Sequence, residues 1–278
     1  MTEILSASAL LQQRLWSADP EAWALYSEPH NRPLFEAVLD AAQVATGTDL
    51  LDVACGTGLV LQLAVERGAT VTGIDVSAAM LGVAKERLPE ADLRLIDMQV
   101  LPFADDSFDA VTGVNAFQFA ADPVAAIVEA ARVLRPGGRL AVGMFAEPER
   151  SQSTAIHDAM AMLSPPARDG EHQPYALSAP GNLEAVFASA GLTLEGQGQG
   201  EVECVWAYDK VDDAVRGLRG SGGGTRAVED AGAAAVGAAI EQALIPFTDA
   251  AGRVRMVNTF RWVSATKTGA TKAGVTDD

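Results

Sequence analysis

The sequence predicts an α/β protein whose doubly wound, mostly parallel sheet has seven strands. From residue 49 onward, short apolar runs rich in β-branched residues alternate with segments whose apolar residues recur at helical spacing. This alternation is the pattern of βαβ units. The chain of 278 residues is 49% hydrophobic, and open sheets of this kind often reach such a length around one core. We therefore expect one sheet domain with helical additions.

The strands are predicted from apolar runs bounded by turn residues. The first five lie near residues 49–54, 70–75, 92–97, 109–115 and 139–145, another ends near Trp206, and the last covers residues 253–265. Helices are expected over residues 58–68, 77–89 and 122–134, with Ser77 and Asp122 as N-caps. The Pro-Gly-Gly sequence at 136–138 is expected to end the third of these helices.

Helical additions are predicted on both sides of the sheet-forming segments. Residues 1–45 are expected to form an N-terminal helical lid, with Pro33 near a helix start. Residues 46–266 are expected to form the main domain, with helical insertions near 146–180 and 207–250, the second of which contains an Ala-rich helix over residues 228–246. Residues 267–278 are polar and rich in small residues, which predicts a disordered tail.

Composition excludes several classes of partner. The formal net charge is −17, with only 20 Lys and Arg residues, so we expect no nucleic-acid partner. No apolar run approaches the roughly 20 residues of a membrane span, and the N-terminus lacks a basic region; we therefore expect no membrane partner and a cytoplasmic protein. Cys55 and Cys204 show no metal or disulfide spacing, and no metal site is expected. The oligomeric state stays open.

The sequence of the turn after the first strand indicates a nucleoside-binding site. In the run LLDVACGTG, the small residues Ala54, Gly56 and Gly58 alternate before a helix, so the backbone can lie close against a bound nucleoside. About twenty residues on, the second strand ends in Asp75, where a carboxylate can accept both ribose hydroxyls. A diphosphate-binding turn requires a third Gly or Ala, and leucine occupies that position in either register. This disfavours a nicotinamide-dependent oxidoreductase, which we retain as an alternative.

The run DVACGTG resembles motif I of class I S-adenosylmethionine-dependent methyltransferases, a D/E-x-G-x-G-x-G pattern in which Ala54 replaces the first glycine. The resemblance continues through residues 73–81, 91–119 and 129–142, covers about residues 45–146, and is similar to the broad branch that includes quinone-ring methyltransferases. The stretch VTGVNAFQF lacks the Gly-Leu-Arg-Asn signature of the quinone subfamily itself, so no substrate is implied. The resemblance implies a Rossmann-like seven-stranded sheet with an antiparallel last strand, and S-adenosyl-L-methionine as cofactor.

The resemblance also implies cofactor contacts, residue by residue. On the methionine side it implies Ala54, Gly56, Gly58 and, near the sulfonium, Asn115. On the nucleoside side it implies Asp75 for the ribose, Val76 and Met80 flanking the adenine, Asp97 accepting from the adenine amino group and the Met98 backbone donating to the ring.

The sequence indicates the residues of the acceptor-binding side less specifically than those of the cofactor side. His30 is the candidate general base, and Tyr26 resembles a lid tyrosine of this family. His157 and His172 are further candidates. An apolar acceptor pocket could be formed by seven aromatic residues, Trp16, Trp23, Phe117, Phe119, Phe145, Tyr175 and Trp206.

We expect methyl transfer to a small molecule, such as a secondary metabolite or a quinone-like or aromatic compound. The alternative is a protein that uses the cofactor structurally or for a non-methylating reaction such as cyclisation. The acceptor, its reacting atom and the need for a general base stay open.

Overall fold

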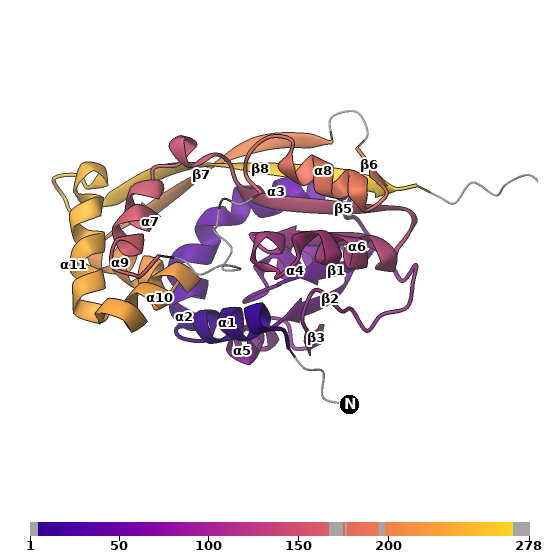
Figure 1. Ribbon diagram of the computed structural model, residues 1–278, viewed down its shortest axis with the longest axis horizontal. Helices are drawn as coiled ribbons and strands as arrows, with labels where there is room; N and C mark the ends of the chain where they lie inside the picture. Colours follow the sequence, from indigo (N-terminus) through magenta and orange to yellow (C-terminus); the bar gives the residue numbers. More distant parts are fainter. Residues whose placement is uncertain (1–4, 167–174, 176, 195–197, 269–278) are drawn as a thin grey trace, which may run out of the picture.

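The computed structural model describes residues 5–166, 175, 177–194 and 198–268 of the chain. Its centre is one twisted sheet with the strand order β3-β2-β1-β4-β5-β8-β6, in which β7 also pairs with β8 (Figure 1). The strands β1 (Asp49–Val53), β2 (Thr70–Asp75), β3 (Asp92–Leu95), β4 (Phe108–Val114) and β5 (Leu134–Phe145) are mutually parallel. The last strand, β8 (Val254–Lys267), is antiparallel to β5.

The sheet is seven strands wide although its described residues form eight strands. The short β6 (Leu192–Thr193) pairs with the end of β8, and β7 (Gln199–Tyr208) pairs with β8 from Val254 to Val263. Because β5 occupies the other side of β8, β6 and β7 share a single edge position. The predicted fold class, with its antiparallel last strand, is confirmed.

Helices cover both faces of the sheet. On one face lie α3 (Arg32–Ala41), α4 (Leu59–Glu66) and α5 (Ala78–Arg87), and on the other α6 (Pro123–Val133) and α8 (Asn182–Ser189). Leu50 packs into the first core and Leu51 into the second, because successive residues of a strand face opposite sides. This alternation explains why two successive leucines of β1 are both fully buried.

Local signals set the helix boundaries. Ser77 accepts from the backbone N–H of Met80, and Asp122 accepts from two N–H groups of α6, so both predicted N-caps are confirmed. The expectation that Pro-Gly-Gly at 136–138 ends α6 was wrong, since the helix ends at Val133 and these residues lie within β5. The residue before a proline avoids helical geometry, which requires the helix to end before Arg135.

The remaining helices form a cap at one end of the sheet (Figure 1). These cap helices are α1 (Ala7–Trp16), α2 (Pro20–Ala22), the turns η1 (Trp23–Ser27) and η2 (Glu28–Asn31), α7 (Thr154–Ala161), α9 (Val211–Arg219), α10 (Gly222–Ala231) and α11 (Ala233–Leu244). Contacts of α10 with α1 and α7, and of α9 with η1, join the three predicted additions. Short 3-10 turns also occur at η3 (Phe117–Phe119), η4 (Pro148–Arg150) and η5 (Ile245–Phe247). None of the helices in the described part of the chain is long and apolar enough to cross a membrane.

Two predictions for the second half of the chain need correction. The expected single helix over residues 228–246 is two helices, because Gly232 adopts a φ of 85° between α10 and α11, a left-handed value that interrupts a helix. The predicted tail begins at residue 267, yet Lys267 is the last residue of β8. Residues 269–278 lie outside the described residues.

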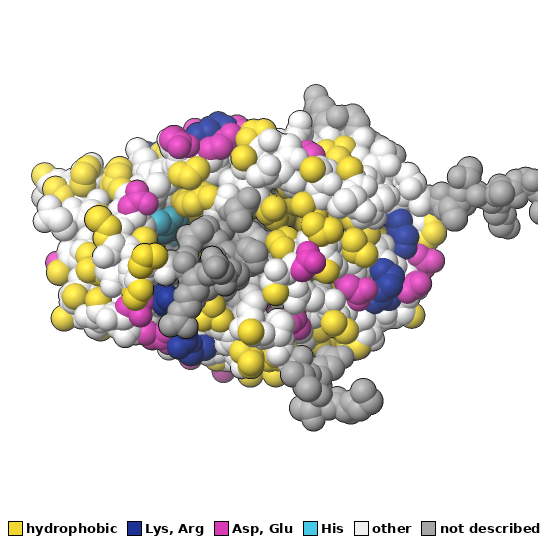
Figure 2. Space-filling view, in the orientation of Figure 1, with side chains coloured by type: hydrophobic (Ala, Val, Ile, Leu, Met, Phe, Trp, Pro, Cys, Tyr) yellow, Lys and Arg dark blue, Asp and Glu magenta, His cyan; other side chains and the backbone are white. Residues whose placement is uncertain are grey.

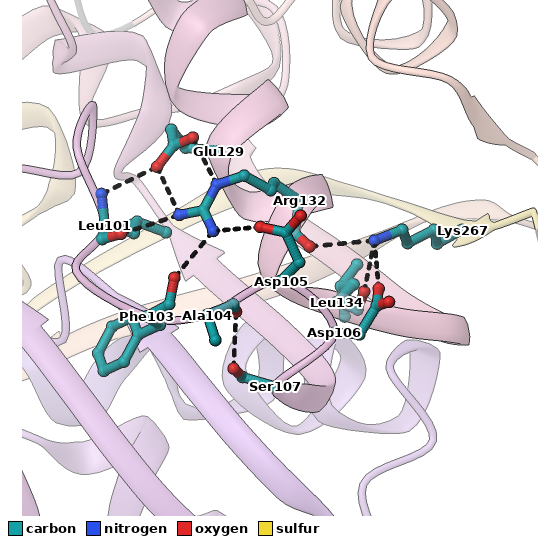
Figure 3. A network of polar contacts seen from close by, with 10 residues as sticks. All are labelled: Leu101, Phe103, Ala104, Asp105, Asp106, Ser107, Glu129, Arg132, Leu134 and Lys267. Atoms are coloured by element: carbon teal, nitrogen blue, oxygen red, sulfur yellow. Dashed lines mark hydrogen bonds and ion pairs between the residues drawn. The ribbon is translucent and has the colours of Figure 1, made fainter.

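A polar network fastens the long loop between β3 and β4 to α6 (Figure 3). Arg132 donates to the backbone carbonyls of Leu101 and Phe103 and forms an ion pair with Asp105. Lys267 donates from Nζ to the carbonyl oxygens of Arg132 and Leu134. Because two carbonyl groups of this loop are satisfied by one guanidinium, the loop after β3 is held against α6.

Candidate functional site

A cavity of about 520 Å³ opens at the carboxyl ends of the parallel strands, between the sheet and the cap helices. This volume lies in the range of about 300 to 1,000 Å³ typical of small-molecule sites, and the position is that expected for ligands of open α/β sheets. Seven of the nine predicted cofactor residues line it, namely Ala54, Gly56, Asp75, Val76, Met80, Met98 and Asn115. The other two, Gly58 and Asp97, do not.

The turn after β1 presents its backbone to the cavity. Ala54 and Gly56 adopt left-handed φ values of 57° and 55°, and a Cβ built on Gly56 meets nothing within 4 Å. Ala54 bears a strain of roughly 1 kcal/mol there, which explains why the family pattern has glycine at this position. A Cβ at Gly58 would lie 3.1 Å from the Cβ of Ala84. Gly58 therefore allows close packing against Ala84 of α5, and it does not line the cavity.

Buried carboxylates lie at the end of the cavity formed by β1 and β2. Asp75 accepts from the backbone N–H groups of Gly56 and Ser77 at 2.9 and 2.8 Å, one bond to each carboxylate oxygen. Each oxygen keeps a second lone pair, as acceptance of two ribose hydroxyls requires. Burial raises the pKa of Asp75.

Asp52 and Glu28 line the same end of the cavity, and neither was predicted as a site residue. Asp52 is 2% exposed and accepts from Oγ1 of Thr112 at 2.7 Å. Burial raises its pKa to about 7, to which the charges of Asp75 and Glu28 contribute. Glu28 forms an ion pair with Arg87 at 2.7 Å, whereas Asp52 and Asp75 form no ion pair with a described residue. A cationic ligand would therefore be stabilised here.

The two missed carboxylates differ in how they could have been found. Asp52 is the first residue of the DVACGTG motif, so the motif itself carried the signal. Glu28 comes from η2 and reaches the site only through its contacts with Arg87 and with the backbone N–H of Leu59. No local pattern around Glu28 indicates these contacts.

The adenine side of the predicted site is covered by α1. Asp97 accepts from Oγ of Ser6 at 2.7 Å and from the backbone N–H of Gln99 at 3.1 Å. Since Ser6 is the N-cap of α1, the carboxylate that was predicted to hold adenine holds the start of this helix. Gln13 of α1 donates to the carbonyl oxygen of Val76 at 3.0 Å. The helix is thus fastened directly to the loops after β2 and β3.

Two amide side chains after β4 offer unused hydrogen-bonding groups. Oδ1 of Asn115 is buried without a described partner, and so are both amide atoms of Gln118, a residue that is 1% exposed. Both residues line the cavity. Because buried polar atoms are nearly always hydrogen-bonded, these amides are suited to a ligand.

The predicted catalytic residues His30 and Tyr26 do not line the cavity. Nε2 of His30 lies 2.7 Å from the carbonyl oxygen of Ala207, and the Tyr26 ring lies beneath Arg216. Trp23, Ser27 and Asn31 do line the cavity. Trp23 and Ser27 belong to the π-helix η1 and Asn31 ends the 3-10 turn η2, so these two elements reach the cavity without Tyr26 or His30.

The acceptor end of the cavity is aromatic and carries a different histidine. Of the seven aromatic residues predicted to gather here, Trp16, Trp23, Phe119, Phe145, Tyr175 and Trp206 line the cavity. Phe117 is fully buried and packs under Gly113 instead. His157 of α7 also lines the cavity, with Nδ1 2.9 Å from the hydroxyl of Tyr175. Burial lowers the pKa of His157 to about 4. His172 lies outside the described residues.

Basic side chains of the described residues form no continuous patch on the face of the molecule shown in Figure 2. On the face shown in Figure 2, Lys and Arg side chains stand in small separate groups among Asp and Glu. Within the described ranges, no group of three or more His, Cys, Asp or Glu side chains is arranged to hold a metal ion.

Comparison with known proteins relates part of the chain to methyltransferases. Residues 51–142 match the methyltransferase domain family. The chain is 38% identical over 130 residues to demethylmenaquinone methyltransferase of Renibacterium salmoninarum, covering 47% of this chain and 55% of that protein. It is 35% identical over 185 residues to methyltransferase GfsG of Streptomyces halstedii, covering 63% of each. The matches thus span between about half and two thirds of these relatives.

A solved structure extends the likeness to nearly the whole fold. Geranyl diphosphate C-methyltransferase from Streptomyces coelicolor A3(2), solved with S-adenosyl-L-homocysteine, superposes with a TM-score of 0.57 at 14% identity, over 95% of this chain and 100% of that one. The sheet order, the glycine turn and the sequence match agree. Residues 51–142 therefore match a methyltransferase domain, and the chain resembles class I S-adenosylmethionine-dependent methyltransferases of the broad branch that includes the quinone-ring methyltransferases.

Proposed function

We propose that this protein transfers the methyl group of S-adenosyl-L-methionine to a small-molecule acceptor. The observation that carries the proposal is one cavity with two chemically different ends. One end has a glycine turn and the buried carboxylates Asp52 and Asp75, and the other is walled by aromatic rings. The first suits a nucleoside with positively charged groups, and the second suits an apolar acceptor.

The residues present fit the cofactor. Asp75 would hold the ribose, Val76, Met80 and Met98 would flank the adenine, and Asp52 and Glu28 would stabilise its positive charges. The Cβ position of Gly56 opens into the cavity, so the backbone there can touch a ligand. When bound, the cofactor supplies an already activated methyl group. The protein's own tasks are then to bind, to orient the acceptor and to exclude water.

The acceptor is proposed to be a small molecule with an apolar, ring-containing body. Six aromatic side chains line the cavity, and among them Phe145 packs against Tyr175 and Trp206. One relative is named for a quinone acceptor, demethylmenaquinone. The formal net charge of −17 and the separated basic groups of Figure 2 argue against nucleic acid as the substrate.

The cap helices are proposed to act as a lid over a methyltransferase domain of residues 46–266. The helix α1 contributes Leu11, Leu15 and Trp16 to the cavity wall and is fastened to the cofactor loops by Ser6 and Gln13. These few hydrogen bonds, each contributing about 1 kcal/mol, would allow the helix to open for ligand exchange.

Titration calorimetry followed by product analysis tests this function. The purified protein should bind S-adenosyl-L-methionine and, with a panel of aromatic acceptors, form S-adenosyl-L-homocysteine together with a methylated product. Asp75→Asn should weaken binding, whereas the matched surface variant Asp40→Asn, at a side chain that is 73% exposed, should not. Conversion of an acceptor to an isomer with no S-adenosyl-L-homocysteine would favour the cyclisation alternative. No binding of either cofactor form would refute the proposal.

A further inference from the structure

A chain of hydrogen bonds at the acceptor end of the cavity ends at a backbone carbonyl. Oγ1 of Thr154 donates to the carbonyl oxygen of Pro148 at 2.6 Å. The hydroxyl of Tyr175 lies 3.2 Å from that Oγ1 and 2.9 Å from Nδ1 of His157. Four groups from η4, α7 and Tyr175 are thereby linked in a row.

The donors in this row can be assigned from the number of hydrogens. A carbonyl only accepts, so the single hydroxyl hydrogen of Thr154 is committed to Pro148. The bond between Thr154 and Tyr175 must then use the hydrogen of Tyr175. Burial raises the pKa of Tyr175, which keeps that hydrogen in place. With it committed, Nδ1 of His157 must donate to the Tyr175 oxygen.

This assignment fixes the tautomer of His157. In a neutral ring with a protonated Nδ1, the lone pair is on Nε2. Nε2 makes no hydrogen bond with a described residue, and His157 lines the cavity. The ring packs edge to face on Phe145, with ring centroids 5.5 Å apart. Phe145 ends β5, the strand beside β4, whose carboxyl end carries Asn115.

The ring is also kept neutral. Burial lowers the pKa of His157 to about 4, although the charge of Asp158 acts in the opposite direction. A proton acceptor is therefore present at neutral pH. A hydroxyl oxygen that has gained a methyl group is a strong acid until it loses its proton, so even a weakly basic imidazole can take that proton.

We propose that Nε2 of His157 accepts the proton of a hydroxyl-bearing acceptor, an alcohol or a phenol, during methyl transfer. Tyr175 and Thr154 are positioning residues that fix the ring. In this step the acceptor oxygen forms a bond to the methyl carbon. The bond between that carbon and sulfur breaks, and its electron pair goes to sulfur. The hydroxyl proton goes to Nε2 of His157. The inference rests on the proposed function and adds the acceptor atom to it.

The tautomer can be measured without any substrate. In ¹⁵N-labelled protein, two-bond ¹H–¹⁵N spectra of the imidazole rings, assigned with His157→Gln, should show a protonated Nδ1 and an unprotonated Nε2 for His157 at pH 7. Tyr175→Phe removes the acceptor and should move the proton toward Nε2. A wild-type ring with its proton on Nε2 would overturn the assignment.

Matched acceptors test the proton transfer. With 1-naphthol, His157→Gln should reduce kcat by about 100-fold or more. With 1-naphthalenethiol at pH 8, where the thiol is largely ionised and needs no base, the rate should change little. His30→Gln, at a histidine outside the cavity, is the control for both. Equal losses with the two acceptors would indicate a structural role and overturn the proposal.

The two levels of inference fail in different ways. Failure of the wild-type protein to bind S-adenosyl-L-homocysteine in calorimetry would refute the proposed function. Normal binding by wild type and His157→Gln, together with the wrong tautomer or equal rate losses, would refute the role of His157 alone. If neither naphthalene compound is methylated, the tautomer measurement decides.

Discussion

Cofactor binding should be linked to the protonation of Asp52, and the variant Asp52→Asn should remove the link. The pKa of this carboxyl rises from 3.8 to about 7 in the folded protein. At 1.36 kcal/mol per unit, keeping it ionised costs the unliganded protein roughly 4 kcal/mol above pH 7. A cation bound beside it recovers part of that free energy, because the ionised form is then favoured.

The sign of the dependence follows from the raised pKa. Between about pH 4 and pH 7 the folded, unliganded protein holds a proton on Asp52 that the unfolded chain has lost, so this group's contribution to stability falls as pH rises through that window. Binding of the cationic cofactor should expel the proton. Affinity should therefore weaken as pH falls from 7 to 6, by at most about tenfold.

Calorimetry at pH 6 and 8.5, in two buffers of different ionisation enthalpy, measures both effects. Wild-type protein should release close to one proton per cofactor at pH 6 and almost none at pH 8.5. Asp52→Asn should release fewer protons than wild type at pH 6 and bind with a weaker pH dependence, while Asp40→Asn should behave as wild type. The reasoning is refuted if wild-type affinity and proton release are the same at both pH values, or if Asp52→Asn keeps the wild-type dependence.

Three further outcomes are expected. Gly56→Val places a β-branched side chain at a φ of 55° facing the cavity. Calorimetry should then detect no cofactor binding, while circular dichroism shows an intact fold. Retained binding would remove this turn from the site. Asp75→Asn should lose about 1.5 to 3 kcal/mol of cofactor affinity, and unchanged affinity would contradict the ribose assignment. Deletion of residues 1–18 removes the hydrogen bonds of Ser6 and Gln13, so cofactor affinity should fall by only about tenfold. Methyl transfer should be lost because water enters the cavity. A full transfer rate would contradict the proposed lid.

The predictable parts of the molecule are those with local causes. The strands β1 to β5 follow from apolar runs, and the caps Ser77 and Asp122 follow from the chemistry of the first helical turn. The position of Asp75 beside the glycine turn follows from the geometry of adjacent parallel strands. In each case the residues that determine the feature lie within a few positions or one βαβ unit of it.

The parts that could not be predicted depend on contacts between distant segments. Asp97 occupies the predicted strand end, but its carboxylate is held by Ser6, 91 residues away. Glu28 enters the cavity because Arg87 of α5 holds it there. The choice among the histidines depended on how three separate additions pack, and only the packed cap shows that His157 lines the cavity and His30 does not.

Methyl transfer itself is tested most directly with S-adenosyl-L-methionine carrying a ¹³C-labelled methyl group. The purified protein, the labelled cofactor and a library of apolar hydroxyl compounds would be incubated together and followed by mass spectrometry. We expect one labelled methyl group in an acceptor molecule for each S-adenosyl-L-homocysteine formed, and loss of both products in Asp75→Asn. Conversion of an acceptor without incorporation of the label, while the cofactor stays intact, would contradict methyl transfer as the function of this cavity.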